Sequence, residues 1–208
     1  MKNIFIVLFF VSSIAKATDP YPKNEAIDVT KYIFQLEVND STDVIAGTAS
    51  VFIHFKKTVA DFELDLINKD ATGKGMVIED VLLNDKHICF SHKNNRIKII
   101  LPIQAKADEN FIFKIIYKGI PQDGLIIGKN KFGDRGFFGD NWPDRGHHWL
   151  PVVDHPSDKA AVDFIIIAPM HYSVIANGIK IEESPIDSKR TLTHWHEEVP
   201  IPVKVMVA

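Results

Sequence analysis

The segment from His196 to Pro200 begins like a signature for zinc-dependent hydrolysis. It reads H-E-E-V-P, whereas the signature H-E-x-x-H needs two histidines one helical turn apart to bind the metal, with the glutamate as the base. Proline takes the place of the second histidine, and Pro200 together with Pro202 precludes a regular helix. We therefore predict no zinc site in this segment.

Two other groups of side chains have a spacing that could support chemistry. His194 and His196 would lie on one face of a strand, but two ligands are too few for a metal site. Asp61, Glu63 and Asp65 would share one face of another strand, and no histidine or nucleophile accompanies them. We expect the histidines to make ordinary hydrogen bonds and the carboxylates to form a solvated outer face. The chain is thus predicted to hold no metal-binding and no catalytic residue.

The stretch from Phe132 to His155 interrupts the pattern of the rest of the sequence. It is rich in glycine, aromatic, charged and histidine residues, and it follows neither the period of a strand nor that of a helix. A connection of this length within a compact domain is usually functional or packed by its own side chains. The stretch is therefore the candidate region for function.

A family resemblance is carried by the residues from Phe138 to Ala161, which read FGDNWPDRGHHWLPVVDHPSDKAA. They resemble a segment of the N-terminal domain of the aminopeptidase N family of zinc metallopeptidases, in which Leu-Pro precedes Asp-x-Pro-Ser-x-Lys-Ala. Two further parts are similar to that domain in order and spacing, namely the opening hairpin from Asp28 to Gly47 and the closing strand from Trp195 to Pro202. The resemblance covers essentially the whole chain after residue 17.

The resemblance implies that the chain is one part of a larger enzyme. In that family a thermolysin-like catalytic domain holds zinc through H-E-x-x-H, and the N-terminal domain supplies a loop before Leu-Pro that holds the free amine of the peptide substrate. The corresponding residues here are Asp140, Asn141 and Trp142, where the family often has Gln or Glu. The catalytic domain is absent from this chain, so zinc is expected in that missing domain and the chain is predicted to be inactive alone.

Four other residues of the same stretch are expected to be structural. Pro151 and Pro156 would make the backbone rigid, and Trp149 would supply buried area that anchors the loop. Asp154 would cap exposed backbone amides or pair with Arg145 or Lys159.

The elements around this stretch are predicted to be strands. Apolar residues recur at every second position, which is the period of a half-buried strand, and turn residues separate the runs. The fold predicted is all-β, an antiparallel twisted, saddle-like sheet or sandwich. The apolar stripes begin at Tyr32, Ala49, Phe62, Val81, Ile97, Phe111, Phe164 and Val203.

The first residues predict export. Residues 1–17 combine a charged start, an apolar run and a small-residue cleavage site, as in a signal peptide, which places the protein in a secreted or periplasmic location. The run is too short to span a bilayer, so no membrane span is expected after cleavage. The formal charge of the 208 residues is −3, which does not favour nucleic acid as a partner. Cys89 is the only cysteine and is expected to be buried.

The expected domain therefore spans residues 18–208. Its last stripe, from Val203 to Val207, reads as a strand with no turn after it, so we expect a truncated chain or a fragment. Two functions remain open. The first is an accessory N-terminal domain of an exported aminopeptidase that helps to close the active-site cleft over a peptide substrate. The second is a free-standing secreted β-sandwich that binds peptide or carbohydrate through aromatic residues, namely Phe137, Phe138, Trp142 and Trp149.

Overall fold

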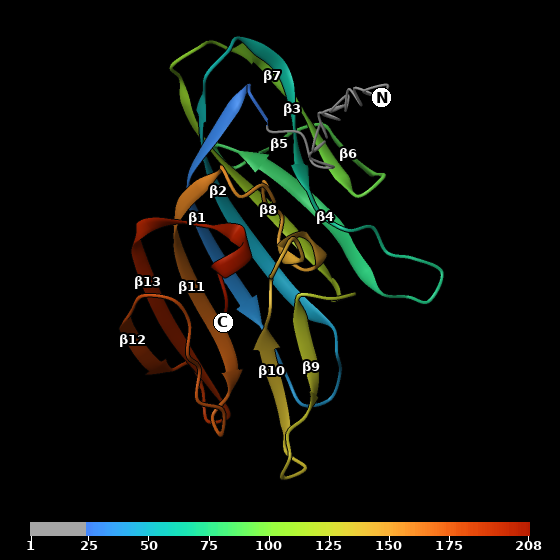
Figure 1. Cartoon of the computed structure of the whole chain (residues 1–208), viewed down its shortest axis with the longest axis vertical. Coiled ribbons are helices and arrows are strands. Elements are labelled where there is room, and N and C mark those ends of the chain that lie inside the picture. The colour runs from blue at the N-terminus through green and yellow to red at the C-terminus, as the bar shows by residue number, and fades with distance from the viewer. Residues whose placement is uncertain (1–23) are drawn as a thin grey trace, which may run out of the picture.

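The computed structural model describes residues 24–208, so the predicted signal peptide at residues 1–17 lies outside the described residues. Most strands belong to one eight-stranded sheet with the order β12–β13–β11–β1–β2–β8–β4–β5 (Figure 1). In chain order these strands are β1 (Ile27–Glu37), β2 (Ile45–Phe55), β4 (Gly75–Leu83), β5 (Lys86–His87), β8 (Asn110–Ile120), β11 (Lys159–Pro169), β12 (Ile179–Pro185) and β13 (Arg190–Pro202).

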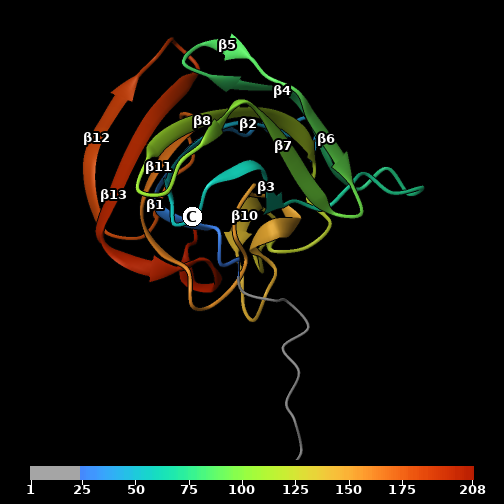
Figure 2. The ribbon, with the colours of Figure 1, turned by 90° about the horizontal axis from the view of Figure 1, so that it is seen from above.

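Two smaller sheets and two short 3-10 helices complete the described part of the chain. The three-stranded sheet has the order β3–β7–β6, and β9 pairs with β10 alone. Figure 2 shows the large sheet curving around β3 and β10, which lie on its concave side. The elements are β3 (Val59–Asp65), β6 (Phe90–Lys93), β7 (Arg96–Ala105), β9 (Leu125–Lys129), β10 (Arg135–Gly139), η1 (Gly146–His148) and η2 (Val203–Val205).

The period of two in the sequence places the core on the concave side of the large sheet. Along β1, Tyr32, Phe34 and Leu36 are buried while the residues between them are partly or fully exposed. Val51 of β2 is opposite Tyr32 and is also fully buried. Each such aliphatic or aromatic side chain contributes about 1.5–3 kcal/mol when it is removed from water. The prediction of an all-β, saddle-like domain is confirmed.

One strand pair departs from the antiparallel expectation. β1 and β11 are parallel, with Phe34 opposite Phe164. Parallel neighbours need a long crossover connection, and here more than a hundred residues separate the two strands in sequence. Strands β9, β10 and β12 were not predicted, because their apolar residues are interrupted by glycine or largely exposed.

The predicted strand from Val203 to Val207 is wrong. The chain makes a 3-10 turn at Val203–Val205, and the amide of Met206 donates to the carbonyl of Val203 at 3.0 Å. Val203 and Met206 are the two buried side chains of the turn, whereas Val205 is 40% exposed. Apolar residues three positions apart suit a turn better than a strand, and the alternating valines concealed this second spacing.

The expectation that Cys89 is buried is also wrong, because its side chain is exposed. Its neighbours Ile88 and Phe90 both pack against the core. In extended chain, successive side chains point to opposite faces, so two inward neighbours force Cys89 outward. Among the described residues, no helix is long and apolar enough to cross a membrane.

Candidate functional site

The candidate site lies on the long connection from β10 to β11, which returns across the concave side of the large sheet. The connection is fixed to β3 by a pair of backbone hydrogen bonds. The amide of Asp65 donates to the carbonyl of Val152 at 2.6 Å, and the amide of Val152 donates to the carbonyl of Asp65 at 3.1 Å. The amide of Ile67 donates to the carbonyl of His147 at 2.8 Å. These bonds attach the irregular segment to β3 and to Ile67 just after it.

Asn141 is buried, and both ends of its side chain are in use. Its amide nitrogen donates to the carbonyls of Val203 and Met206, at 3.2 and 2.5 Å. Its carbonyl oxygen accepts the indole N–H of Trp149 at 2.7 Å. With 1% of the residue exposed, Asn141 offers no polar atom to a ligand. Its geometry is that of a clamp between the loop and the turn η2.

Trp149 joins this clamp to the core. The side chain is 1% exposed, and its ring stacks on Phe164 of β11, with ring centroids 6.4 Å apart and planes at 13°. Pro151 is buried and Pro156 is exposed. The loop is therefore anchored at its middle by an aromatic contact in the interior.

A buried polar network fixes the second half of the loop. Asp154 accepts from both the backbone amide and the ring Nδ1 of His147, at 3.0 and 2.7 Å. The amide of Asp154 donates to the carboxylate of Asp65, which also pairs with Arg96 at 2.8 Å. Burial raises the pKa of Asp65, and the hydrogen bond from the amide of Asp154 and the charge of Arg96 oppose that rise. Asp154 thus pairs with His147, and the pairing with Arg145 named as an alternative is not formed.

Asp140 is a partly exposed acid of the site. One oxygen, Oδ2, accepts from Arg145 at 2.6 Å, and Arg145 also reaches Asp123 at 3.3 Å. The other oxygen of Asp140, Oδ1, has no hydrogen-bond partner among residues 24–208. The side chain is 36% exposed. A carboxylate with one paired and one open oxygen can accept a further charged donor.

Trp142 follows immediately and points to the surface. It is 58% exposed, and the ammonium of Lys204 lies 4.4 Å from the centroid of its ring. The backbone carbonyl of Trp142 accepts from Arg145 at 2.5 Å. The three residues predicted for substrate binding therefore differ in burial: Trp142 is exposed, Asp140 is partly exposed and Asn141 is buried.

The other candidates from the sequence are found elsewhere. His194 and His196 both face Asp163, at 3.3 and 2.5 Å, and Lys31 pairs with the same carboxylate. Burial by itself would raise the pKa of Asp163, but the hydrogen bonds from Lys31 and the two histidines outweigh it and hold the pKa below its usual range. Within the described part of the chain, no group of three or more His, Cys, Asp or Glu side chains is arranged to hold a metal ion.

The carboxylates of β3 do not form the expected solvated face. Asp61 and Glu63 are exposed, but Asp65 is buried in the network described above. Asp65, the last residue of β3, points inward and is covered by the loop. Nothing in the sequence around Asp65 predicts that the loop packs over it.

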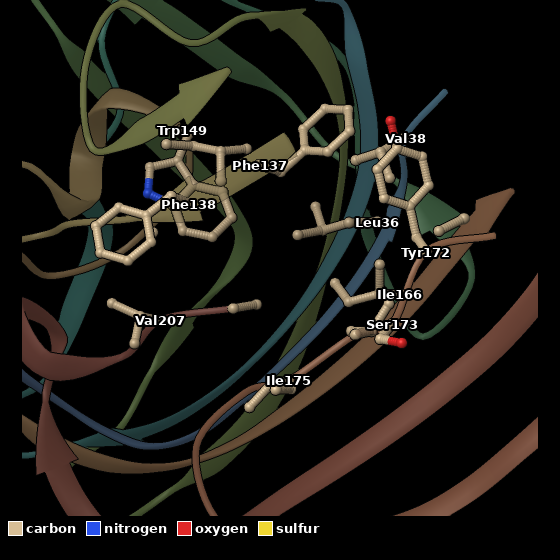
Figure 3. Close-up of a pocket in the computed structure, with 15 residues that line it drawn as sticks. Leu36, Val38, Phe137, Phe138, Trp149, Ile166, Tyr172, Ser173, Ile175 and Val207 are labelled. Carbon is tan, nitrogen blue, oxygen red and sulfur yellow. The ribbon is translucent and has the colours of Figure 1, made fainter. Parts of the chain in front are cut away.

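A cavity that the sequence does not reveal lies beside the site. It has a volume of about 450 Å³ and is lined mainly by apolar side chains from β1, β10, β11 and the segment after β11 (Figure 3). Trp149 forms part of its wall, and so do the last two residues, Val207 and Ala208. No pattern could have indicated it, because its walls come from six separate parts of the sequence.

The sequence matches the Peptidase M1 N-terminal domain family over residues 28–203, so the chain belongs to this family. The resemblance to the N-terminal domain of zinc metallopeptidases is thereby confirmed. No curated protein sequence matches the chain.

Solved structures of M1 zinc metallopeptidase from Deinococcus radiodurans have the same fold. One is 21% identical with a TM-score of 0.74, and covers 88% of this chain and 41% of that one. A mutant bound to a Tyr-Ser-Ala substrate is 20% identical with a TM-score of 0.75, and covers 88% of this chain and 42% of that one. The chain thus spans less than half the length of these solved peptidases.

Proposed function

We propose that the chain is the N-terminal domain of an exported zinc aminopeptidase, which removes the first residues of peptides. The observation that carries the proposal is the family match over residues 28–203, together with the greater length of the structurally similar peptidases. The family resemblance implies that zinc and the groups that activate its bound water belong to a catalytic domain outside this chain. Residues 1–17 direct export, to a secreted or periplasmic location.

Within that enzyme, the loop before Leu150 closes one side of the cleft and holds the free amine of the substrate. Asp140 is the residue suited to the amine, because its open oxygen can accept a hydrogen bond from an ammonium group. Arg145 holds the other oxygen and so sets the direction of the carboxylate. Trp142 offers an exposed ring that already lies against one cation, the ammonium of Lys204. Asn141 takes the role of positioning both neighbours.

The reading frame beyond Ala208 provides the experiment that tests the proposal. We expect it to encode H-E-x-x-H, and we expect the longer product to hold zinc and to release amino acids from amino-acyl anilides. Chain 1–208 alone should bind no stoichiometric zinc and show no turnover. In the longer product, Asp140→Ala should lower kcat/KM toward free N-termini by about 10- to 100-fold, as for the loss of a hydrogen bond to a charged group. Full activity in this variant would remove the amine-binding role.

The signal peptide has a separate test. Expression with the native start should yield a mature protein whose first residue is Thr18, as determined by N-terminal sequencing of the exported fraction. Retention of residues 1–17 in that fraction would contradict the proposed cleavage.

The cavity beside Trp149 favours a second candidate, a free-standing module that binds peptide or carbohydrate. A mainly apolar cavity of about 450 Å³ has the size of many ligand sites. A stop codon directly after Ala208, together with saturable binding of peptides or oligosaccharides to the chain, would favour this candidate over the first.

A further inference from the structure

Strand β10 has one open edge. It pairs only with β9, and its register places Phe138 opposite Ile126 and Gly139 opposite Leu125. The amide of Asp140 donates to the carbonyl of Gly124, on the β9 side. Because successive backbone groups of a strand point to opposite edges, those of Gly139, Phe137 and Arg135 point away from β9.

The chain has already begun to pair with this open edge. The amide of Gly139 donates to the carbonyl of Ala208 at 3.1 Å. On the opposite side, the amide of Val207 donates to the side chain of Asn177 at 2.6 Å, and the amide of Asn177 donates to the carbonyl of Val207 at 3.3 Å. Backbone groups that alternate between two sides in this way are those of an extended strand.

The direction of pairing follows from two contacts. Met206 is bound by Asn141, and Ala208 is bound by Gly139. As the chain advances from Met206 to Ala208, it therefore moves back along β10 toward its beginning. Figure 1 shows the C-terminus close to the end of β10, beside the free length of that strand. A continuing chain would run antiparallel to β10.

The cavity described above lies along this path. Val207 and Ala208 form one part of its lining, and Phe137, Tyr172 and Val38 form another (Figure 3). Phe137 and Ile127, which are paired across β9 and β10, both pack against the core, whereas Phe138 is 65% exposed and lines only the rim of the cavity. A strand added beside β10 would share this alternation, so every second side chain would point toward the cavity.

We propose that the polypeptide following Ala208 adds a third strand to the β9–β10 sheet, antiparallel to β10, and fills the cavity with apolar side chains at every second position. This inference rests on one part of the proposed function, namely that a further domain follows Ala208. From the bond between Gly139 and Ala208, the second residue of the added strand lies opposite Phe137, and the fourth lies opposite Arg135. These even positions are the ones that point inward.

The test extends the chain after Ala208 by six residues in two matched forms of identical composition. The first form is Thr-Val-Thr-Val-Thr-Val, which places valine at the inward positions, and the second is Val-Thr-Val-Thr-Val-Thr, which places threonine there. In the first form we expect a higher Tm and slower hydrogen exchange at the amide of Phe137, by at least about tenfold, because that amide gains an acceptor. The amide of Phe138, which faces β9, should not change. The second form should resemble the unextended chain.

Equal behaviour of the two forms, or an unchanged exchange rate at Phe137 in the first, would overturn the proposal. A dimer of the unextended chain in light scattering, with the amide of Phe137 already protected, would also overturn it, since a second copy would then occupy the edge. The experiment is independent of the chemistry of the whole protein. A downstream reading frame without H-E-x-x-H would defeat the proposed function and leave this result intact.

Discussion

Phe34 and Trp149 both pack against the ring of Phe164, but the chain places them by different means. Phe34 lies on β1 with its ring centroid 5.6 Å from that of Phe164, and the two residues are directly opposite in the parallel pair. Trp149 comes from the irregular loop, and its position depends on the hydrogen bond to Asn141. The contact of Phe34 follows from the alternation of side chains along a strand. The contact of Trp149 depends on its hydrogen bond to Asn141.

The difference shows where the specificity of each region resides. In the large sheet, alternate burial fixes the register, and a shift by one residue would expose every core side chain at once. In the loop, the fixed points are polar and distant in sequence, such as the bond from Asn141 to Met206 across 65 positions. We therefore expect the sheet to tolerate conservative changes of shape, and the loop to be sensitive to the loss of single hydrogen bonds.

The largest effect should come from removing either ring. Trp149→Ala and Phe34→Ala should each lower the free energy of unfolding by about 3–5 kcal/mol, because each leaves a cavity against Phe164. Urea denaturation followed by circular dichroism measures both. A loss below about 1 kcal/mol for Trp149→Ala would mean that the loop contributes little to the core. The contact of Trp149 with Phe164 would then not be equivalent to that of Phe34.

Loss of the clamp should have the next largest effect. Asn141→Ala leaves the indole N–H of Trp149 and the carbonyls of Val203 and Met206 without their partner, at a cost of about 2–3 kcal/mol. Combining it with Trp149→Phe should cost less than the sum of the two single changes, because both remove the same bond. Urea denaturation of the four proteins of this cycle gives the coupling. Strict additivity would show that the clamp does not act as a unit.

These two regions also differ in how far the sequence could predict them. The stripes at Tyr32, Ala49 and Phe164 were sufficient for the strands that carry them, because burial on one face leaves a period of two. The parallel pairing of β1 with β11 could not be predicted, since it depends on how distant segments meet. For the candidate site, the motif located the loop, but it could not separate partly exposed Asp140 from buried Asn141. That distinction depends on η2, which the alternating valines concealed.

A pH-dependent effect should come from Asp158, where the loop enters β11. Burial raises the pKa of Asp158 to about 6, and the nearby charge of Asp28 adds to the rise. Its Oδ1 accepts only a long bond from Val29, at 3.4 Å, and its Oδ2 has no partner within the described residues. An acid whose pKa is raised on folding binds its proton more readily in the folded state, so stability falls as the pH rises from about 4 to about 6.

Asp158→Asn should therefore be more stable than the original chain at pH 7, by about 2 kcal/mol, and should lose the dependence between pH 4 and 6. Thermal melting at a series of pH values in that window measures this, with the exposed Asp61→Asn as the matched control. If Asp158→Asn and Asp61→Asn change the pH dependence of Tm alike, then burial does not raise the pKa of Asp158.

The smallest effect on the free energy of unfolding is expected for Asp140, the residue before Asn141. Asp140→Asn breaks an ion pair with Arg145 at the surface, and such pairs contribute about 0–1 kcal/mol. Arg145 keeps Asp123 and the carbonyl of Trp142 as partners, so its side chain does not become isolated. Urea denaturation should place this variant within about 1 kcal/mol of the original chain, well apart from Asn141→Ala. A loss as large as that of Asn141→Ala would mean that the carboxylate supports the loop, and its open oxygen would then be a poor candidate for holding a substrate amine. A small loss in the free energy of unfolding would show that the fold does not depend on the charge of Asp140. That charge is then available to bind a ligand.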